Sequence, residues 1–208
     1  MGLPPRRGGK CLCDFGLLGE TRGRIVGGCG PLVAVRCLVG CRRLVVLATG
    51  AWLNQLARPF GVRMPVQAGR GYSLSVKTDE PVAAPIYLPT ARVACTPYRD
   101  GLRIGGTMEF RSADHPLVPA RVDALLSSAR PWLSGVQWRT VSDFWVGPRP
   151  VSADGMPLIG ATRSAKVFVA GGHGMWGVTL GPVTGKLLAS QIVSGRSPDA
   201  LSAFNPLR

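Results

Sequence analysis

The stretch from residue 167 to residue 195 constrains the fold more than any other part of the chain. Its sequence is VFVAGGHGMWGVTLGPVTGKLLASQIVSG. The short apolar run at its start predicts a buried strand, and the glycine-rich segment predicts a tight corner. The apolar spacing from Pro182 onward predicts a helix that ends at Gly195. This order of strand, corner and helix predicts one unit of an α/β fold.

The corner favours a planar ligand with a negatively charged edge. Four glycines stand in it: Gly171, Gly172, Gly174 and Gly177. They leave out side chains that would hold a flat group away, and the free N–H groups of a helix start favour a negative atom. His173 and Trp176 can pack on such a ligand, and Thr179 can donate its hydroxyl. The alternatives are that the glycines serve packing and that His173 is a structural group.

Charge does not decide the function. The chain has 208 residues, of which 46% are hydrophobic and 17% charged, and this balance is typical of a globular protein. The net charge of +14 comes mainly from arginines that are scattered along the sequence. Arginines do not alternate with aromatic residues in a stripe, so we expect no nucleic-acid binding. A basic interaction protein, including one that binds nucleic acid, is an alternative supported only by the net charge.

The cysteines indicate neither a disulfide framework nor a metal site. Five of the six lie within the first 41 residues. Their spacing does not match the paired two-residue gaps of zinc sites, and no signal-peptide pattern precedes them. No uncharged apolar run approaches the ~18 residues of a transmembrane helix. We therefore expect free thiols, no metal and a cytoplasmic protein.

The composition changes near residue 43. Residues 1–43 are rich in glycine, arginine and cysteine and show no sustained period, so no element is assigned to them. Two interpretations of this leader stay open: a native loop-rich segment, or a GC-rich gene read in a shifted frame. After it, LVVLATGAWLNQL predicts a strand, a Thr-Gly turn and the start of a helix. LRIGGTMEF predicts another strand, and a helix is expected after Pro119.

Arg149 is a candidate for anion binding because prolines flank it in the motif GPRP. The prolines stiffen the backbone, so this arginine is held on a rigid segment. A guanidinium presents a fixed fork of donors that matches a carboxylate. The alternative is that Arg149 caps a carbonyl or pairs with Asp143 or Asp154.

Three segments in this order resemble the D-amino-acid oxidase and dehydrogenase family of FAD-dependent oxidoreductases. They are VVLATGAW at 45–52, WVGPRPVSADGMPLIG at 145–160 and VFVAGGHGMWGVTLGPVTGKLLA at 167–189. GRGYSL at 69–74 and ACTPYRDGLRIGGTMEF at 94–110 look like the substrate domain of the bacterial D-amino-acid dehydrogenase branch. The resemblance covers about residues 44–198, and the motifs are specific in combination rather than singly.

The resemblance implies an α/β (α+β) protein with a partial FAD-binding, Rossmann-like domain and an antiparallel-sheet substrate domain. The FAD domain would consist of residues 44–63 and 147–198. The substrate domain would occupy residues 64–146. The leader, 1–43, precedes these domains, and a tail, 199–208, follows them.

The resemblance also implies roles for individual residues. Thr49 and Gly50 would lie in the turn that runs alongside the dinucleotide, and Arg149 would bind the substrate carboxylate. The residues at the flavin would be His173, Gly174, Met175, Trp176, Gly177, Val178 and Thr179. The implied reaction moves a hydride from the α-carbon of a D-amino acid, or a related secondary amine, to the flavin, and water then hydrolyses the imino acid. Orientation carries this reaction, so we assign no general base, neither His173 nor Asp154.

The usual pyrophosphate-binding turn, G-x-G-x-x-G, has no good match in this sequence. Gly28-Cys29-Gly30 is the one candidate, but Val33 stands in place of the third glycine, and we interpret it as a chance match. We therefore expect the C-terminal portion of a flavoprotein, whose strands LVVLAT and VFVAGG lack neighbours. Such a chain would be a catalytically silent relative, or a subunit whose partner chain supplies the nucleotide-binding half. If a quinone-linked carrier accepts the electrons, a loose association with the inner face of the membrane would follow.

Overall fold

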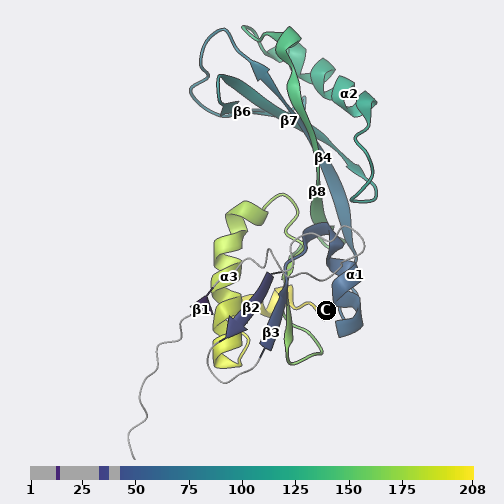
Figure 1. Cartoon of the computed structure of the whole chain (residues 1–208), viewed down its shortest axis with the longest axis vertical. Helices are drawn as coiled ribbons and strands as arrows, with labels where there is room; N and C mark the ends of the chain where they lie inside the picture. The colour runs from purple at the N-terminus through teal and green to yellow at the C-terminus, as the bar shows by residue number, and fades with distance from the viewer. Residues whose placement is uncertain (1–12, 15–32, 38–42) are drawn as a thin grey trace, which may run out of the picture. The chain divides into compact units, whose positions relative to one another are not determined.

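The computed structural model describes residues 13–14, 33–37 and 43–208, with side chains from residue 44 onward, and they form two compact units (Figure 1). Unit 1 consists of the described residues up to Pro65 together with Ser152–Arg208. Unit 2 is the continuous segment Val66–Val151. The expected substrate domain, 64–146, ends inside a strand, and the boundary of unit 2 lies at the end of that strand instead.

Unit 1 is built on a five-stranded sheet with the order β1-β2-β3-β10-β9. The strands are β1 Cys13–Asp14, β2 Val33–Cys37, β3 Arg43–Leu47, β9 Leu158–Ala161 and β10 Val167–Gly171. The helices are η1 Gly50–Trp52, α1 Leu53–Ala57, η2 Arg58–Phe60, α3 Gly177–Ser194 and η5 Asp199–Phe204. Only β3 and β10 are parallel among these pairs; the others are antiparallel.

The expectation that LVVLAT and VFVAGG lack neighbours is wrong. β3 is bonded to β2 on one side and to β10 on the other, and β10 is bonded to β9. The leader supplies β2, although it shows no strand period, because its short run VAVRC pairs along β3 from Val33↔Val46 to Arg36↔Arg43. After a turn at Gly155 the chain returns as β9 beside β10. Backbone groups that we expected to be unpaired are therefore satisfied.

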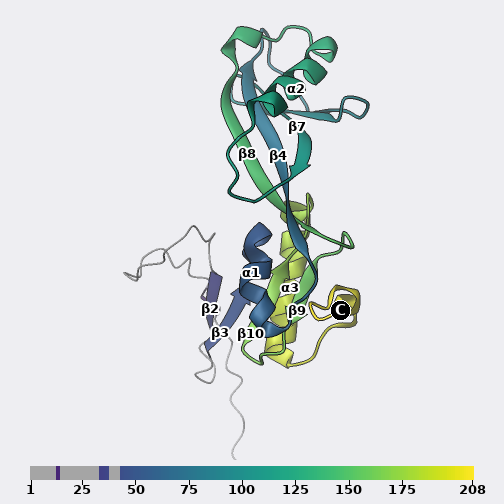
Figure 2. The same cartoon turned by 90° about the vertical axis from the view of Figure 1, so that its right-hand side faces the viewer.

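The two main helices of unit 1 cover opposite faces of its sheet (Figure 2). Val46 and Phe168 face Leu188 of α3 in one apolar cluster. On the other face, a Cβ placed on Gly171 would lie 2.9 Å from Leu53 Cδ2 at the start of α1. This alternation follows from the two-residue period of a strand. The sheet is therefore the middle layer of a helix–sheet–helix unit, as the α/β expectation requires.

The C-terminal helix and the segment after it differ from their sequence prediction. α3 begins at Gly177, before the predicted start at Pro182, and Pro182 lies inside it. Gly195 ends the helix in the left-handed conformation, φ +71°, as predicted. The expected tail forms η5, whose Leu201 is buried in the same cluster as Leu188. The last residues are therefore part of the folded unit.

Unit 2 is an antiparallel sheet with the order β5-β6-β7-β4-β8 and one helix across it. The strands are β4 Val66–Lys77, β5 Ile86–Leu88, β6 Val93–Tyr98, β7 Gly101–Phe110 and β8 Ser142–Ser152. The helices are α2 Pro119–Ala129, η3 Arg130–Trp132 and η4 Trp138–Thr140. The predicted strand LRIGGTMEF and the helix after Pro119 are both present.

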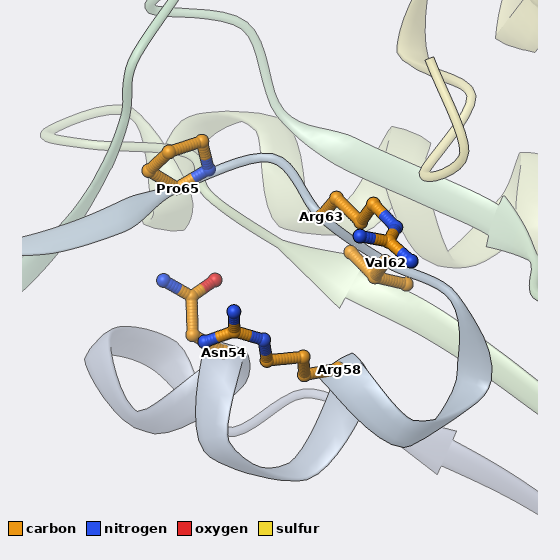
Figure 3. Close-up of a pocket in the computed structure, with 5 residues that line it drawn as sticks. All are labelled: Asn54, Arg58, Val62, Arg63 and Pro65. Atoms are coloured by element: carbon orange, nitrogen blue, oxygen red, sulfur yellow. The ribbon is translucent and has the colours of Figure 1, made fainter.

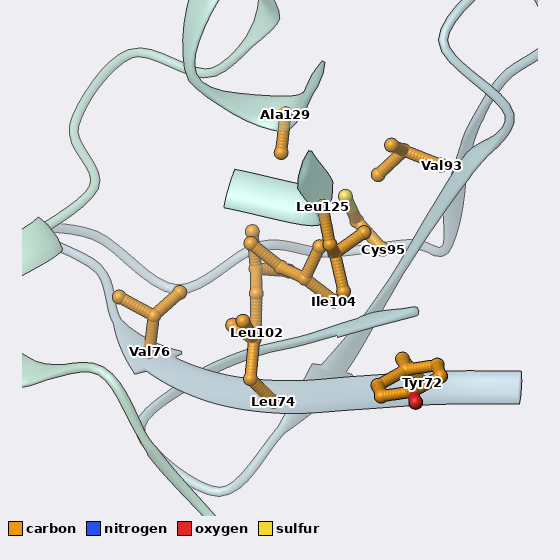
Figure 4. Close-up of a cluster of buried hydrophobic side chains, with 9 residues drawn as sticks. All are labelled: Tyr72, Leu74, Val76, Val93, Cys95, Leu102, Ile104, Leu125 and Ala129. Atoms are coloured by element: carbon orange, nitrogen blue, oxygen red, sulfur yellow. The ribbon is translucent and has the colours of Figure 1, made fainter. Parts of the chain in front are cut away.

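The core of unit 2 lies between this sheet and α2 (Figure 4). Tyr72 and Leu74 of β4 and Ile104 of β7 are fully buried against Leu125 and Ala129 of α2. Because side chains alternate along a strand, the odd-numbered residues of β4 from Gly69 to Ser75 point to the opposite face. One face of the sheet thus carries the core and the other carries small residues.

Candidate functional site

The carboxyl ends of β3 and β10 bring the two predicted cofactor segments together. The strands are parallel neighbours in the register Leu47↔Val169, so both chains leave the sheet at the same edge. β3 continues into Thr49 and Gly50, and β10 continues into the glycine corner. Ligands of open α/β sheets bind outside the carboxyl ends of the strands. This edge is therefore the candidate cofactor site.

Observations at this edge fit a bound dinucleotide. Thr49 is 3% exposed, and its Oγ1 atom has no hydrogen-bond partner in the described part of the chain. Buried hydroxyls normally have a partner, so this donor is available to a group other than the described residues. Gly50 (φ +58°) and Gly174 (φ +55°) have left-handed backbones, and a Cβ added at either would meet no atom of the described residues within 4 Å. The backbone is open to a close approach at both positions.

The start of α3 adds backbone donors to the same edge. Trp176 is the N-cap and makes no side-chain capping bond. The N–H of Leu180 donates to the Trp176 carbonyl at 2.8 Å, so the N–H groups of Gly177, Val178 and Thr179 precede the helical ladder. Free N–H groups and the helix dipole stabilise negative charge. The side chains of Met175, Trp176 and Val178 are exposed, so the backbone defines this part of the site.

His173 is tied to the body of α3. Its Nε2 atom lies 2.9 Å from Thr184 Oγ1, and Thr184 is buried. Burial lowers the pKa of His173, so the ring is neutral at pH 7. These contacts support the structural alternative for its side chain, while its backbone still belongs to the corner.

Asp154 is an ionised structural carboxylate. Arg208 donates to both of its oxygens, at 2.8 and 3.1 Å, and the N–H of Met156 donates to Oδ1 at 3.0 Å. The hydrogen bonds from Arg208 lower the pKa of Asp154 to about 2. A carboxylate with so low a pKa is only weakly basic and is therefore poorly matched to proton abstraction at neutral pH.

Arg149 lies on β8 in unit 2 and makes no hydrogen bond or ion pair with the described part of the chain. The carboxylates proposed as its alternative partners are engaged elsewhere. Asp143 lies 3.9 Å from Arg99, and Asp154 pairs with Arg208 at 2.8 Å. Partial burial lowers the pKa of Arg149 because desolvation disfavours its charged form. A partly desolvated, unpaired guanidinium is suited to an incoming anion.

The Arg149 side chain packs against the backbone of a glycine residue in the sheet. A Cβ added to Gly71 would lie 2.1 Å from Arg149 Nη1, so the guanidinium rests directly on the backbone of β4. A Cβ on Gly69 would lie 2.8 Å from Val151 Cγ2, and one on Gly147 only 1.9 Å from the Trp145 ring. We define the open face of unit 2 by these glycines, Ser73, Gly105 and the side chains above them: Arg103, Met108, Phe110, Trp145 and Arg149.

Sequence reasoning missed most of this open face, although a signal was present. Small residues recur at every second position in GRGYSLS, namely Gly69, Gly71, Ser73 and Ser75. A strand with one large, apolar face and one small face is typical of a sheet whose second side admits a ligand or another backbone. In the sequence this motif stands out only by its resemblance to the family's substrate domain.

Sequence reasoning also missed a buried ionic network on the core side of the same sheet. Arg70 is fully buried, and its Nη1 lies 3.4 Å from Glu109 Oε1. The Tyr72 hydroxyl donates to Glu109 at 2.6 Å, and this bond, with the nearby arginines, lowers the pKa of that carboxyl despite its burial. Arg111 and Arg121 pair with its other oxygen at 3.2 and 3.7 Å. The network fixes the pairing of β4 with β7.

Two further hollows contain none of the residues predicted from the sequence. One, of about 350 Å³, lies in unit 1 beside α1 (Figure 3). It is lined by Asn54, Arg58, Val62, Arg63 and Pro65. The other, of about 510 Å³, lies in unit 2 and includes Asp79 and Trp132 in its lining.

Three other expectations concern the pyrophosphate-binding turn, metal binding and membrane-spanning helices. The Gly28-Cys29-Gly30 turn lies outside the described residues. Among the residues that are described, no group of three or more His, Cys, Asp or Glu side chains is placed to hold a metal ion. No helix in that part of the chain combines the length and the apolar character needed to cross a membrane.

Comparison with known proteins decides the family. The DAO family, described as FAD dependent oxidoreductase, matches residues 6–191. This chain belongs to that family. The match confirms the resemblance and also extends through most of the leader, beyond the expected range of 44–198. The family is FAD-dependent, which confirms the expected cofactor class and the oxidoreductase class of the family.

Curated relatives share the name that the sequence suggested. The D-amino acid dehydrogenase of Methylobacterium radiotolerans is 36% identical over 160 residues, which are 76% of this chain and 38% of the relative. That of Xanthobacter autotrophicus is 35% identical over 159 residues, 75% of this chain and 38% of the relative. The chain therefore spans less than two-fifths of the curated relatives that it matches.

Solved structures share the fold. Glycine oxidase from Geobacillus kaustophilus superposes with a TM-score of 0.68 at 26% identity, covering 85% of this chain and 49% of that one. L-proline dehydrogenase from P. horikoshii superposes with a TM-score of 0.66 at 18% identity, covering 91% of this chain and 53% of that one. These structures support the FAD-dependent oxidoreductase fold, and the predicted α/β class is confirmed.

Proposed function

We propose that this chain takes part in the FAD-dependent oxidative deamination of D-amino acids or related secondary amines. The names of its relatives support this activity, and so does the presence of two kinds of binding position. Unit 1 offers an open, donor-rich sheet edge for the cofactor. Unit 2 offers a guanidinium that has no carboxylate partner among the described residues.

In unit 1, the Ala-Thr-Gly turn and the glycine corner would hold the flavin nucleotide. Among the described residues, Thr49 Oγ1 is a buried donor without a hydrogen-bond partner, and no atom lies close to the positions of a Cβ on Gly50 or Gly174. The N–H groups of Gly177, Val178 and Thr179 would stabilise negative charge at one edge of the ligand. When bound, FAD supplies the acceptor for the hydride.

In unit 2, Arg149 would bind the α-carboxylate of the substrate and fix its orientation. A bidentate pair between guanidinium and carboxylate restricts rotation of the bound amino acid, and orientation lowers the barrier by entropy. The carboxylate also replaces the water that Arg149 has lost by partial burial. The substrate amine enters neutral, so the chain needs no base to remove a proton from it.

The observation that carries the proposal is that Arg149 is partly desolvated, rests on Gly71 and has no carboxylate partner among the described residues. The test is to incubate the purified chain with FAD, record the flavin absorbance, and add D-alanine without oxygen. Loss of the flavin absorbance is expected, because the hydride reduces the cofactor. Arg149→Gln should slow the bleaching by about 100-fold, the scale of a lost orienting contact. Equal rates in both proteins would refute the role of Arg149.

A second candidate is that the chain binds flavin only with a partner polypeptide that supplies a nucleotide-binding half. The exposed surface of α3 favours it. Val178 is 94% exposed and Val193 is 68% exposed, and a Cβ on Gly181 or Gly185 would meet no atom within 4 Å among the residues that the structure describes. An apolar helix face of this kind is typical of an interface.

The partner candidate predicts a colourless chain that becomes yellow when co-expressed with the first half of a related D-amino acid dehydrogenase. A yellow chain that binds FAD alone would refute it. Electron transfer to a quinone-linked carrier at a membrane surface would be a further step of the same proposal. It would appear as reduction of a soluble quinone analogue in place of oxygen.

A further inference from the structure

Arg103 is a second arginine on the open face of unit 2. Its Nε and Nη2 atoms donate to Ser73 Oγ at 3.2 and 3.0 Å. Its guanidinium lies over the ring of Trp145, 5.3 Å from the ring centre. It pairs with no carboxylate in the described part of the chain. Two hydrogen bonds and a stacked ring therefore fix its orientation while its charge stays uncompensated.

Arg103 and Arg149 contact positions on β4 that are two residues apart. Arg149 rests on Gly71, and Arg103 bonds to Ser73, two residues farther along β4 on the same face. A two-residue step along a strand measures about 7 Å. The two guanidinium groups therefore lie over one short stretch of β4. Its residues on this face, Gly71 and Ser73, have no large side chain.

Nearby carboxylates do not neutralise this pair. Glu109 is engaged on the core face by Tyr72 and by arginines there. Asp143 pairs with Arg99, and Asp100 pairs with Lys77 at 2.9 Å. Two like charges on one face repel each other, and a ligand with two negative groups would relieve that repulsion as well as gain two charge-assisted hydrogen-bonded contacts.

We propose that Arg103 is a specificity-determining residue that binds the side-chain carboxylate of an acidic amino acid, with the α-carboxylate on Arg149. The ligand class is therefore an amino acid with a terminal side-chain carboxylate, such as D-aspartate or D-glutamate. This inference rests on the proposed function because it takes Arg149 as the α-carboxylate site. Trp145 serves as a positioning residue: its ring lies on Gly147 and holds the guanidinium plane.

The stacked tryptophan provides a signal that does not require flavin. We would titrate the full chain with D-glutamate, D-glutamine and D-alanine and follow tryptophan fluorescence, with Trp145→Phe to identify the responding ring. The pair D-glutamate and D-glutamine differs only in the charge and hydrogen bonding of the side-chain end. Each variant is checked by circular dichroism for an unchanged fold.

The expected result is that D-glutamate binds at least tenfold more tightly than D-glutamine. Arg103→Gln should remove that preference and change the affinity for D-alanine less than twofold. Arg103→Lys, which keeps the charge, should retain part of the preference. Arg130→Gln is the matched control, since Arg130 is also an exposed arginine over a tryptophan ring, 5.5 Å from the centre of Trp138, and it should bind as the unaltered chain does.

The outcomes separate the two proposals. Binding of D-alanine and D-glutamate with equal affinity, lost together in Arg149→Gln, would overturn the role of Arg103 and leave the proposed function in place. An amino-acid affinity that is unchanged in Arg149→Gln would overturn the proposed function and this inference with it. The same holds if the folded chain binds no amino acid. A preference for D-glutamate that survives Arg103→Gln would also overturn the role of Arg103.

Discussion

Replacing Gly71 with alanine should weaken ligand binding without lowering the stability of the fold. The added Cβ would lie 2.1 Å from Arg149 Nη1, whereas ordinary contacts begin at 3.4 Å, so the guanidinium must move by about 1.3 Å. A misplacement of about 1 Å at a binding or catalytic group can cost on the order of 100-fold. Glycine inside a strand is less stable than alanine by about 0.5–1 kcal/mol, so the fold should be unharmed or slightly strengthened.

The assay compares two variants that add the same methyl group. Gly71→Ala and Gly105→Ala both change the open face, but a Cβ on Gly105 meets its nearest atom at 3.7 Å, an ordinary contact. Binding of D-alanine is followed by NMR titration, and stability by urea unfolding. We expect at least a tenfold loss of affinity in Gly71→Ala only. Unchanged affinity there, with Arg149→Gln still defective, would refute the argument that Gly71 holds the guanidinium in place.

Three further predictions concern stability. Glu109→Gln should cost about 3 kcal/mol in urea unfolding, because it leaves the buried Arg70 without its counter-charge; a loss below about 1 kcal/mol would contradict this. The pKa of His173 is lowered in the folded protein, so its neutral ring adds to the free energy of unfolding above the ordinary histidine pKa, and this contribution is lost as pH falls. His173→Gln should therefore flatten the decline of the free energy of unfolding between about pH 7 and pH 5. Deleting Arg208 should raise the pKa of Asp154 from about 2 toward 3.8 and cost about 1 kcal/mol at pH 7. That difference should shrink as pH falls from about 4 through 2, and a constant difference across pH would argue against the ion pair.

The sequence predicts the local elements and the family well because these depend on short-range patterns. The run VFVAGG, the corner and the end of the helix at Gly195 follow from apolar spacing and from glycine's tolerance of positive φ. Residues 33–37 could not be assigned, because what makes them a strand is pairing with β3, a contact that no local period encodes. The same reason explains why β3 and β10 were wrongly expected to lack neighbours.

The candidate site residues were likewise predictable only where a local sequence motif indicates them. The sequence indicated Arg149 as a rigid arginine, yet its carboxylate alternatives could be excluded only when the structure paired Asp143 with Arg99 and Asp154 with Arg208. Arg103 gave no signal of its own, because its importance comes from a cross-strand bond to Ser73 and a ring on a third strand. The assignment of the cofactor residues stays a prediction.

The chain enters unit 2 on β4 and leaves it on β8, and these two strands are bonded neighbours. A Cβ on Gly69 would touch Val151, so the first and last residues of this segment emerge next to each other. Residues 66–151 therefore constitute a cassette that interrupts unit 1 at a single point. Such an insert can be exchanged between relatives as one piece while the sheet of unit 1 is kept intact.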